Sequence, residues 1–417
     1  MRIPRTFKRW LGLLSVAAAT AMLVTACGGG DDNNGGGGSN GGGSSVSDGN
    51  TANTAVITVG TGVAHVINIP TVNVKICVPG TSNCQVVNNV LVDTASYGLR
   101  LVSSVLSSGV LNNLPQTTAG GAPVAECGKF VSSFTWGSVR TVDLSIGTEQ
   151  ASSLPVQIIG DLGTSNVPGS CSNNGARTSA NTASDLGANG ILGIGPAPVD
   201  CGTACATSTS ATSNNYYACP NGNSSCAVAL VPVAQQVANP VHRFATDNNG
   251  VIVQMPNISN SGQGSATGLL TFGINTQSNN ALGASTVLTS TTTGDVDATF
   301  LGGSVTAFFD TGSNAYFFND STQKACSTNT QFYCPSSTTT YTATLTGKNG
   351  VSGGVSMPVA NADALFANPS TFAFNDIAGP FGAAGWLDIG MPHFYGKTIY
   401  FGMDRTGSGG AQPYVAF

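Results

Sequence analysis

The sequence predicts a mostly β protein of two facing lobes with few, short helices, and three observations lead to this class. Short β-branched and aromatic runs alternate with clusters of Gly, Ser, Asn and Thr, whereas helical periodicity is scarce. An apolar run ends in Asp-Thr-Gly-Ser at 310–313, and a similar run ends in Asp-Thr-Ala-Ser at 93–96. Each motif is followed by an apolar run with glycines, at 190–195 and 385–390. A unit that occurs twice predicts two halves related by a pseudo-twofold axis.

Residues 1–26 are interpreted as a secretory signal peptide. Arg2 and Arg5 belong to a basic start, and an apolar run over 11–24, too short for a comfortable membrane span, leads to small residues. The stretch Val24-Thr25-Ala26-Cys27 resembles the bacterial lipobox, in which cleavage occurs before a cysteine that carries lipid. This resemblance implies a lipoprotein anchored to the bilayer through Cys27. Cleavage elsewhere, with Cys27 incidental, is the alternative.

Residues 27–54 are predicted to form a flexible tether. They consist almost entirely of Gly, Asn, Ser and Asp, and cannot bury enough apolar surface to offset the entropy of ordering. Gly28 stands where an aspartate is associated with retention in the inner membrane. We therefore expect a lipid-anchored protein of a bacterial cell envelope, at the outer membrane.

Composition limits the classes of partner and cofactor. Lys and Arg together number 14 and the net charge is −5, so no basic patch can neutralise a phosphate backbone, and nucleic acid is not expected as a partner.

Of the 11 cysteines, an even number remain once Cys27 is set aside, which in an exported protein indicates disulfides. Cys77 with Cys84, and Cys326 with Cys334, are plausible local pairs. A zinc site at 201, 205, 219 and 226 is the alternative, although it lacks the tight pairs of common zinc modules.

The body of the chain is predicted to form an N-terminal β lobe over 55–245 and a C-terminal β lobe over 246–417. The strands expected are 55–59, 63–69, 71–78, 85–92, 156–160, 251–255, 269–274, 398–403 and 414–417, with a hairpin in 130–146 around Trp136. A short helix is expected within 99–111, the best helix candidate is Ala227 to Val241, and 196–226 is expected to be a disulfide-bound surface loop. The run Gly190 to Gly195 has the wrong glycine spacing for a dinucleotide fingerprint, and we interpret it as a buried strand.

The two Asp motifs place carboxylates between strongly β-forming runs, where ionisation is costly without compensation. Gly312 permits a tight turn beside Asp310, and flanking hydroxyl groups can fix the orientation of the carboxylate.

In the order and spacing of these motifs, the chain from residue 55 to 417 resembles the pepsin-like aspartic proteases, which are two β lobes related by pseudo-twofold symmetry. It also looks like an uncharacterised family of bacterial lipoproteins. The resemblance to the proteases implies that Asp93 and Asp310 form a catalytic dyad. It further implies that Thr94 and Thr311 brace the two loops, that Ser96 and Ser313 hydrogen-bond the carboxylates, and that Trp136 falls near the flap tyrosine of the family. No cofactor or metal is expected, and the implied partner of a monomer is a peptide or protein in a cleft between the lobes.

Three positions depart from the protease pattern. Ala95 replaces the glycine of the first turn, where its methyl group can crowd the turn. Arg100 stands near the tryptophan that supports the flap, and Trp136 has no hydroxyl group for the flap tyrosine's hydrogen bond. These departures leave open a catalytically inactive, aspartic-protease-like binding protein of the cell envelope.

The motifs and histidines leave two further alternatives open. Asp93 and Asp310 could be ordinary turn residues, since Asp, Gly and Ser are common in hairpin turns. A serine hydrolase would need one of three histidines, His65, His242 or His393, as its base, but the chain has no Gly-x-Ser-x-Gly elbow. Each histidine is expected to be structural.

Overall fold

The computed structural model describes residues 50–417. The predicted signal peptide, Cys27 and most of the predicted tether lie outside the described residues. Within 50–417, no helix has both the length and the apolar character needed to cross a bilayer.

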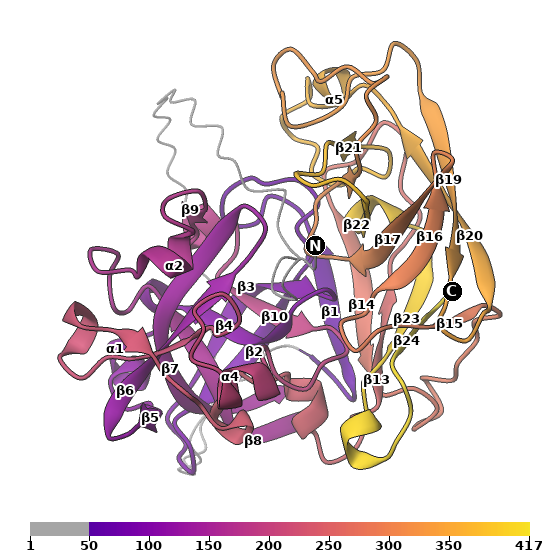
Figure 1. The fold of residues 1–417 in the computed structure, drawn as a ribbon. Coiled ribbons are helices and arrows are strands. Elements are labelled where there is room, and N and C mark those ends of the chain that lie inside the picture. The colour runs from indigo at the N-terminus through magenta and orange to yellow at the C-terminus, as the bar shows by residue number, and fades with distance from the viewer. Residues whose placement is uncertain (1–49) are drawn as a thin grey trace, which may run out of the picture.

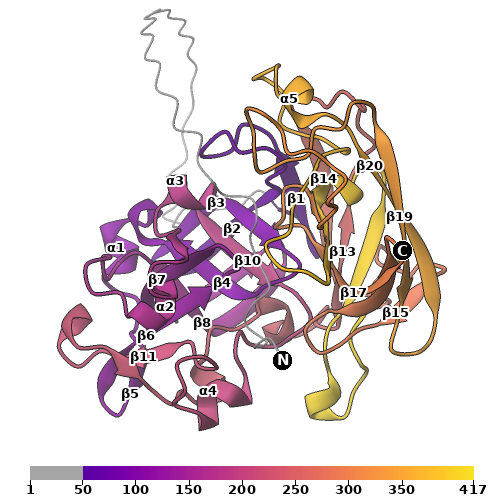
Figure 2. The same cartoon turned by 45° about the horizontal axis from the view of Figure 1, so that its top comes forward.

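The fold is mostly β, as predicted, with strands gathered in two barrel-like sheets and only short helices (Figures 1 and 2). The 17-stranded large sheet consists of β1 (Thr54–Val59), β2 (Thr71–Cys77), β3 (Cys84–Asp93), β4 (Tyr97–Val102), β5 (Thr118–Ala119), β6 (Ala122–Lys129), β7 (Ser133–Ile146), β8 (Glu149–Ile159), β9 (Thr178–Ser179), β10 (Gly190–Ile194), β11 (Tyr216–Ala218), β12 (Ala227–Val228), β13 (Gly250–Gln254), β14 (Ala266–Phe272), β15 (Val287–Thr289), β23 (Thr398–Gly402) and β24 (Tyr414–Ala416).

The 7-stranded small sheet consists of β16 (Val296–Phe300), β17 (Gly303–Asp310), β18 (Tyr316–Phe317), β19 (Thr339–Thr346), β20 (Ser352–Val359), β21 (Ala378–Gly379) and β22 (Trp386–Gly390). The α-helices are α1 (Ser108–Leu111), α2 (Gly169–Ser172), α3 (Ala183–Leu186), α4 (Thr203–Thr207) and α5 (Ala362–Leu365). Short 3-10 helices cover Ser103–Val105, Gly222–Ser224, Val233–Gln235, Pro240–Arg243, Met391–His393 and Thr406–Ser408.

The same local topology occurs once in each half of the chain. In the first half, β10 pairs parallel with β3, so that Gly193 lies opposite Asp93, and antiparallel with β4. In the second half, β22 pairs parallel with β17, so that Gly390 lies opposite Asp310, and antiparallel with β18. Each Asp-bearing turn is therefore clamped by a glycine-containing strand, which is the repeated unit that the sequence predicted.

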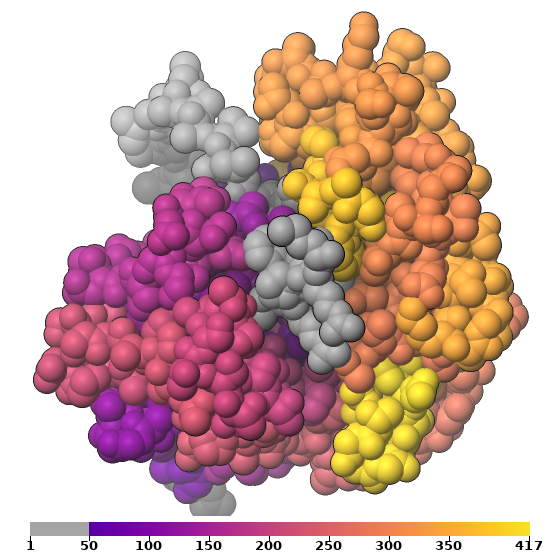
Figure 3. Space-filling view, viewed as in Figure 1, coloured from indigo at the N-terminus to yellow at the C-terminus, as the bar shows by residue number. Residues whose placement is uncertain are grey.

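Strands from distant parts of the chain join the two halves. Along this part of the large sheet β1 pairs with β14, β14 with β13, β13 with β23, β23 with β24 and β24 with β15. Figure 3 shows the indigo-to-magenta and the orange-to-yellow parts of the chain on opposite sides of the molecule. The predicted lobe boundary at 245/246 stays a prediction.

All ten cysteines of the described residues form disulfides, as their even number predicted. The pairs are Cys77–Cys84, Cys127–Cys171, Cys201–Cys205, Cys219–Cys226 and Cys326–Cys334. Both predicted local pairs are present. The zinc alternative at 201, 205, 219 and 226 is wrong, because their sulfur atoms are joined in pairs.

The structure corrects three predicted elements. The helix expected over Ala227 to Val241 is absent, and this stretch holds β12 and two short 3-10 segments, because Pro232 and Pro240 interrupt helical hydrogen bonding. Residues 63–69 form turns rather than a strand, with left-handed backbone at His65. The hairpin expected around Trp136 instead turns at 130–132, and Trp136 lies within the long strand β7.

His393 is a buried histidine that cannot easily ionise. It is 2% exposed, its ring packs against Phe309 and Tyr316, and burial lowers its pKa to about 3. The unfolded chain binds a proton at this side chain near pH 6.5, whereas the folded protein does not until the pH is much lower. The contribution of His393 to stability is therefore present above about pH 6.5 and is lost as the pH falls below it.

We predict that His393→Phe reduces the acid sensitivity of folding. Between pH 7 and 4.5 the wild type should lose about 2–3 kcal/mol more unfolding free energy than the variant, measured by urea denaturation at both values. His65→Asn is the control, since His65 is exposed with a left-handed φ of 56° that asparagine tolerates. Equal losses in the wild type and His393→Phe would contradict this account.

Candidate active site

The two aspartates of the repeated motif lie at the ends of buried strands. The last four residues of β3 and of β17 are buried, and the side chains of Asp93 and Asp310 are 0% and 1% exposed. Apolar strand residues thus carry each carboxylate into the interior, as the apolar runs before the motifs predicted.

Reciprocal threonine hydrogen bonds join the two loops. Thr94 Oγ1 donates to the carbonyl oxygen of Phe309 at 3.1 Å and accepts from the Thr311 backbone N–H at 3.1 Å. Thr311 Oγ1 donates to the carbonyl oxygen of Val92 at 2.6 Å and accepts from the Thr94 N–H at 3.1 Å. Four buried bonds with this internal symmetry fix the separation and the orientation of the loops.

The carboxylates lie together across the braced loops. Asp93 Oδ1 accepts from the backbone N–H of Ala95 at 2.9 Å, and Asp310 Oδ1 accepts from that of Gly312 at 2.7 Å. A Cβ atom added at Gly312 would lie 2.9 Å from Asp310 Oδ1 and 3.0 Å from Asp93 Cγ, so one point touches both side chains. Glycine is needed here for space, since a side chain at 312 would collide with both carboxyl groups.

Ala95 fits the first turn without displacing Asp93. Its backbone N–H makes the same hydrogen bond as that of Gly312, and its side chain is 5% exposed within an apolar cluster that includes Phe308 and Ala315. The methyl group is therefore accommodated by packing against the second half of the chain.

The two serines of the motifs differ. Ser313 Oγ lies 3.2 Å from Asp310 Oδ2, as predicted, and 2.6 Å from Asp388 Oδ2 on β22. Ser96 Oγ is buried without a hydrogen-bond partner among residues 50–417, so its predicted bond to the Asp93 carboxylate is not formed. Sequence reasoning missed Asp388, although a charged residue inside the apolar run 385–390 was a signal.

The turn of the β6–β7 hairpin packs against an apolar cluster formed mostly by the second half of the chain. Val131, at that turn, packs against the apolar cluster that contains Ala95. Trp136, the flap candidate, is instead fully buried within β7, where its ring meets Tyr217 at 5.3 Å and its Nε1 donates to Asn223 Oδ1 at 3.0 Å. Trp136 therefore lies inside a strand of the hairpin and not at its turn.

Arg100 supports this hairpin by an ion pair. Its Nη2 atom lies 2.5 Å from Glu126 Oε1 on β6, with both side chains buried, and its Nη1 atom donates to the carbonyl oxygen of Tyr97 at 2.9 Å. A polar connection from β4 to β6 thus stands where the resemblance led us to expect an apolar one.

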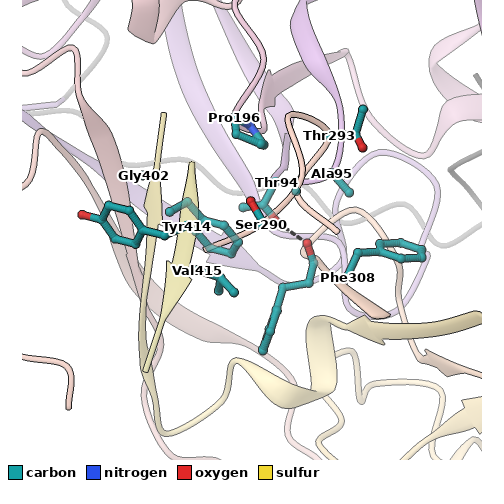
Figure 4. Close-up of a pocket in the computed structure, with 12 residues that line it drawn as sticks. Thr94, Ala95, Pro196, Ser290, Thr293, Phe308, Gly402, Tyr414 and Val415 are labelled. Atoms are coloured by element: carbon teal, nitrogen blue, oxygen red, sulfur yellow. Dashed lines mark hydrogen bonds between the residues drawn. The ribbon is translucent and has the colours of Figure 1, made fainter. Parts of the chain in front are cut away.

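A shallow pocket lies beside the loops (Figure 4). Its lining includes Thr94, Ala95, Pro196, Thr293 and Phe308, and it excludes the side chains of both aspartates. We do not assign it as the substrate cleft for this reason.

None of the three histidines contacts a serine in a way that would suit a serine hydrolase. His242 Nε2 lies 2.9 Å from the carbonyl oxygen of Pro196, His393 is surrounded by aromatic rings, and His65 is exposed beside Phe372. Among the described residues, the pair Asp93 and Asp310 is therefore a better candidate for an active site than any serine and histidine.

Two β halves, each presenting one carboxylate on cross-braced loops, define a two-lobed β protein with an aspartate pair. Residues 49–417 match the family described as "Protein of unknown function (DUF3443)", and the chain belongs to that family. Among solved structures, it is similar to the aspartic proteinase from Irpex lacteus, with 14% identity, a TM-score of 0.48, and coverage of 87% of this chain and 97% of that chain. No curated protein matches the sequence.

We predict that the threonine hydrogen bonds stabilise the fold. Thr94→Val keeps the side-chain shape but leaves two buried backbone groups unpaired, and should lower the unfolding free energy by about 2–4 kcal/mol. The double variant Thr94→Val/Thr311→Val should cost less than the sum of the single variants, because both residues belong to one network.

Denaturant unfolding of the four proteins measures this coupling. Thr342→Val is the control, since Thr342 is exposed on β19 and its replacement should change stability by less than about 0.5 kcal/mol. Strictly additive losses would show that the loops are not coupled.

Proposed function

We propose that this protein is a hydrolase of the aspartic-peptidase type, which cleaves peptide bonds with Asp93 and Asp310. The observation that carries the proposal is the pair of buried carboxylates, held together by backbone N–H donors and by the threonine hydrogen bonds. A hydrogen-bonded carboxylate pair that shares one proton can act as a base and an acid at once.

The chemistry needs only water and the two side chains. The ionised carboxylate takes a proton from a water molecule, and the water oxygen bonds to the scissile carbonyl carbon while the protonated carboxyl gives its proton to the carbonyl oxygen. The resulting gem-diol collapses as the C–N bond breaks. The amine leaves with the proton that the base had taken, and the acid recovers its proton from a diol hydroxyl group. The dyad returns to its starting state, and one water has been added across the peptide bond.

Access of a peptide requires movement. Both carboxylates are almost fully buried, so a covering segment must withdraw before an extended chain can reach them. We propose the turn at 130–132 as this segment, because Val131 packs against the apolar cluster that includes Ala95.

We predict that Asp310→Asn and Asp93→Asn each lower peptide cleavage by roughly a hundred- to ten-thousandfold, since each removes an acid or base. Cleavage of a broad peptide library by the full-length protein, from acid to neutral pH, measures this, and a statine-type inhibitor should block the wild type. Asp185→Asn, at an exposed position, is the control. A folded wild type that cleaves no peptide would reject the hydrolase and favour the inactive binding protein of the cell envelope.

We also propose that lipid on Cys27 anchors the protein in the bacterial cell envelope, at the outer membrane. The lipobox-like stretch before Cys27 and the residue Gly28 support this. Cys27→Ser should abolish incorporation of labelled palmitate and release the protein from membranes, and Gly28→Asp should move it to the inner membrane. Membrane fractionation checks both variants, and unchanged labelling of Cys27→Ser would disprove the anchor.

A further inference from the structure

The two halves differ at one pair of equivalent positions beside the carboxylates. On β10, Ile191 lies opposite Leu91 and is two residues before Gly193, which faces Asp93. On β22, Asp388 lies opposite Phe308 and is two residues before Gly390, which faces Asp310. Ile191 and Asp388 therefore occupy equivalent positions. Ile191 is fully buried in an apolar cluster, and Asp388 is 1% exposed. The second half therefore has a buried carboxyl group where the first has an alkyl group.

Asp388 is connected to the dyad through Ser313. Ser313 Oγ lies 2.6 Å from Asp388 Oδ2 and 3.2 Å from Asp310 Oδ2. In the first half the corresponding atoms, Ser96 Oγ and Asp93 Oδ2, are buried without hydrogen-bond partners among residues 50–417. The pair of aspartates is thus made unequal by a contact that only Asp310 has.

Ser313 has one hydroxyl proton, and two carboxyl groups, those of Asp310 and Asp388, lie close enough to compete for it. A distance of 2.6 Å is typical of a hydroxyl group that donates to a carboxylate, whereas 3.2 Å exceeds the usual range for an O–H···O bond. The Ser313 hydroxyl group therefore donates mainly to Asp388, and Asp310 Oδ2 accepts only the longer, weaker of its two bonds. The competition for this one proton leaves an ionised Asp310 with little stabilisation from Ser313.

We propose that Asp388 is a positioning residue which, through Ser313, keeps the shared proton on Asp310 and leaves Asp93 as the base that activates water. This inference rests on the proposed hydrolase for its role in turnover, but the location of the proton can be tested without cleavage.

The titratable side chains next to Asp388, apart from Asp310, carry no positive charge near neutral pH. The elements packed against β22 carry Asp310 on β17, Tyr316 on β18 and His393 in the 3-10 segment Met391–His393. Burial raises the pKa of Tyr316 and lowers that of His393 to about 3, so both are neutral at mildly acidic and neutral pH. An ionised Asp388 would therefore act on Asp310 without compensation from these two side chains, and it would oppose loss of the Asp310 proton.

The test compares Asp388→Asn and Asp388→Ile with the full-length wild type. The first variant removes the charge at nearly constant shape, and the second installs the residue found at the equivalent position 191. The basic limb of the kcat/KM profile, which follows loss of the shared proton, should move to lower pH by about one unit in both variants. KM should stay unchanged, because Asp388 is 1% exposed and reaches the dyad through Ser313.

Asp247→Asn is the matched control, since Asp247 is also a buried carboxyl group, hydrogen-bonded to Thr276 and Gln277. It should leave the profile in place. A loss of kcat at every pH with no shift of the limb would give Asp388 a merely structural role and overturn the proposal.

A second readout does not depend on turnover. Carbon NMR of labelled aspartate carboxyl groups follows the titration of Asp93 and Asp310, assigned with Asp93→Asn and Asp310→Asn. We expect Asp310 to hold its proton to higher pH than Asp93 in the wild type, and this difference to shrink in Asp388→Asn. Unchanged titrations would overturn the inference whether or not the protein cleaves peptides. A shift in a protein that cleaves nothing would support the role of Asp388 and reject the hydrolase.

Discussion

The reciprocal hydrogen bonds of Thr94 and Thr311 are the interaction on which this structure depends. Each hydroxyl group reaches across to the backbone before the other aspartate, so each half completes the turn of its partner. The strand pairings of β10 and β22 then hold the glycine-containing strands against these turns. Without the threonine network, the two Asp loops would lose the four buried hydrogen bonds that hold their carboxyl groups side by side.

The symmetry of the loops is accompanied by differences around them. Ala95 and Gly312 use the same backbone hydrogen bond, although one side chain packs in an apolar cluster and the other position has no room for a methyl group. The ion pair of Arg100 and Glu126 fastens the hairpin in the first half only. A common backbone thus carries two chemically different environments, which is what a pair of identical side chains needs if one is to act as an acid and the other as a base.

Much of this arrangement could be predicted from the sequence because it is local. The apolar runs before the two Asp motifs, and the glycine runs after them, specify buried strands by composition and length. The helix expected at Ala227 to Val241 was wrong since apolar residues outweighed two prolines in the prediction. The turn at 130–132 and the role of Asp388 could not be derived, because they depend on which strands become neighbours. The hydrogen bond between Ser313 and Asp388 joins residues far apart in the sequence, and no local pattern of residues predicts it.

The strands that join the halves also set an order in time. β1 needs β14, and β13 and β15 need β23 and β24, whose residues lie beyond position 397. A nascent chain that has reached residue 310 possesses both aspartates but lacks the strands that bring their lobes into register. The two carboxyl groups can therefore stay apart while the rest of the chain is synthesised. The sheet that joins the halves is complete only once β23 has paired with β13 and β24 with β15.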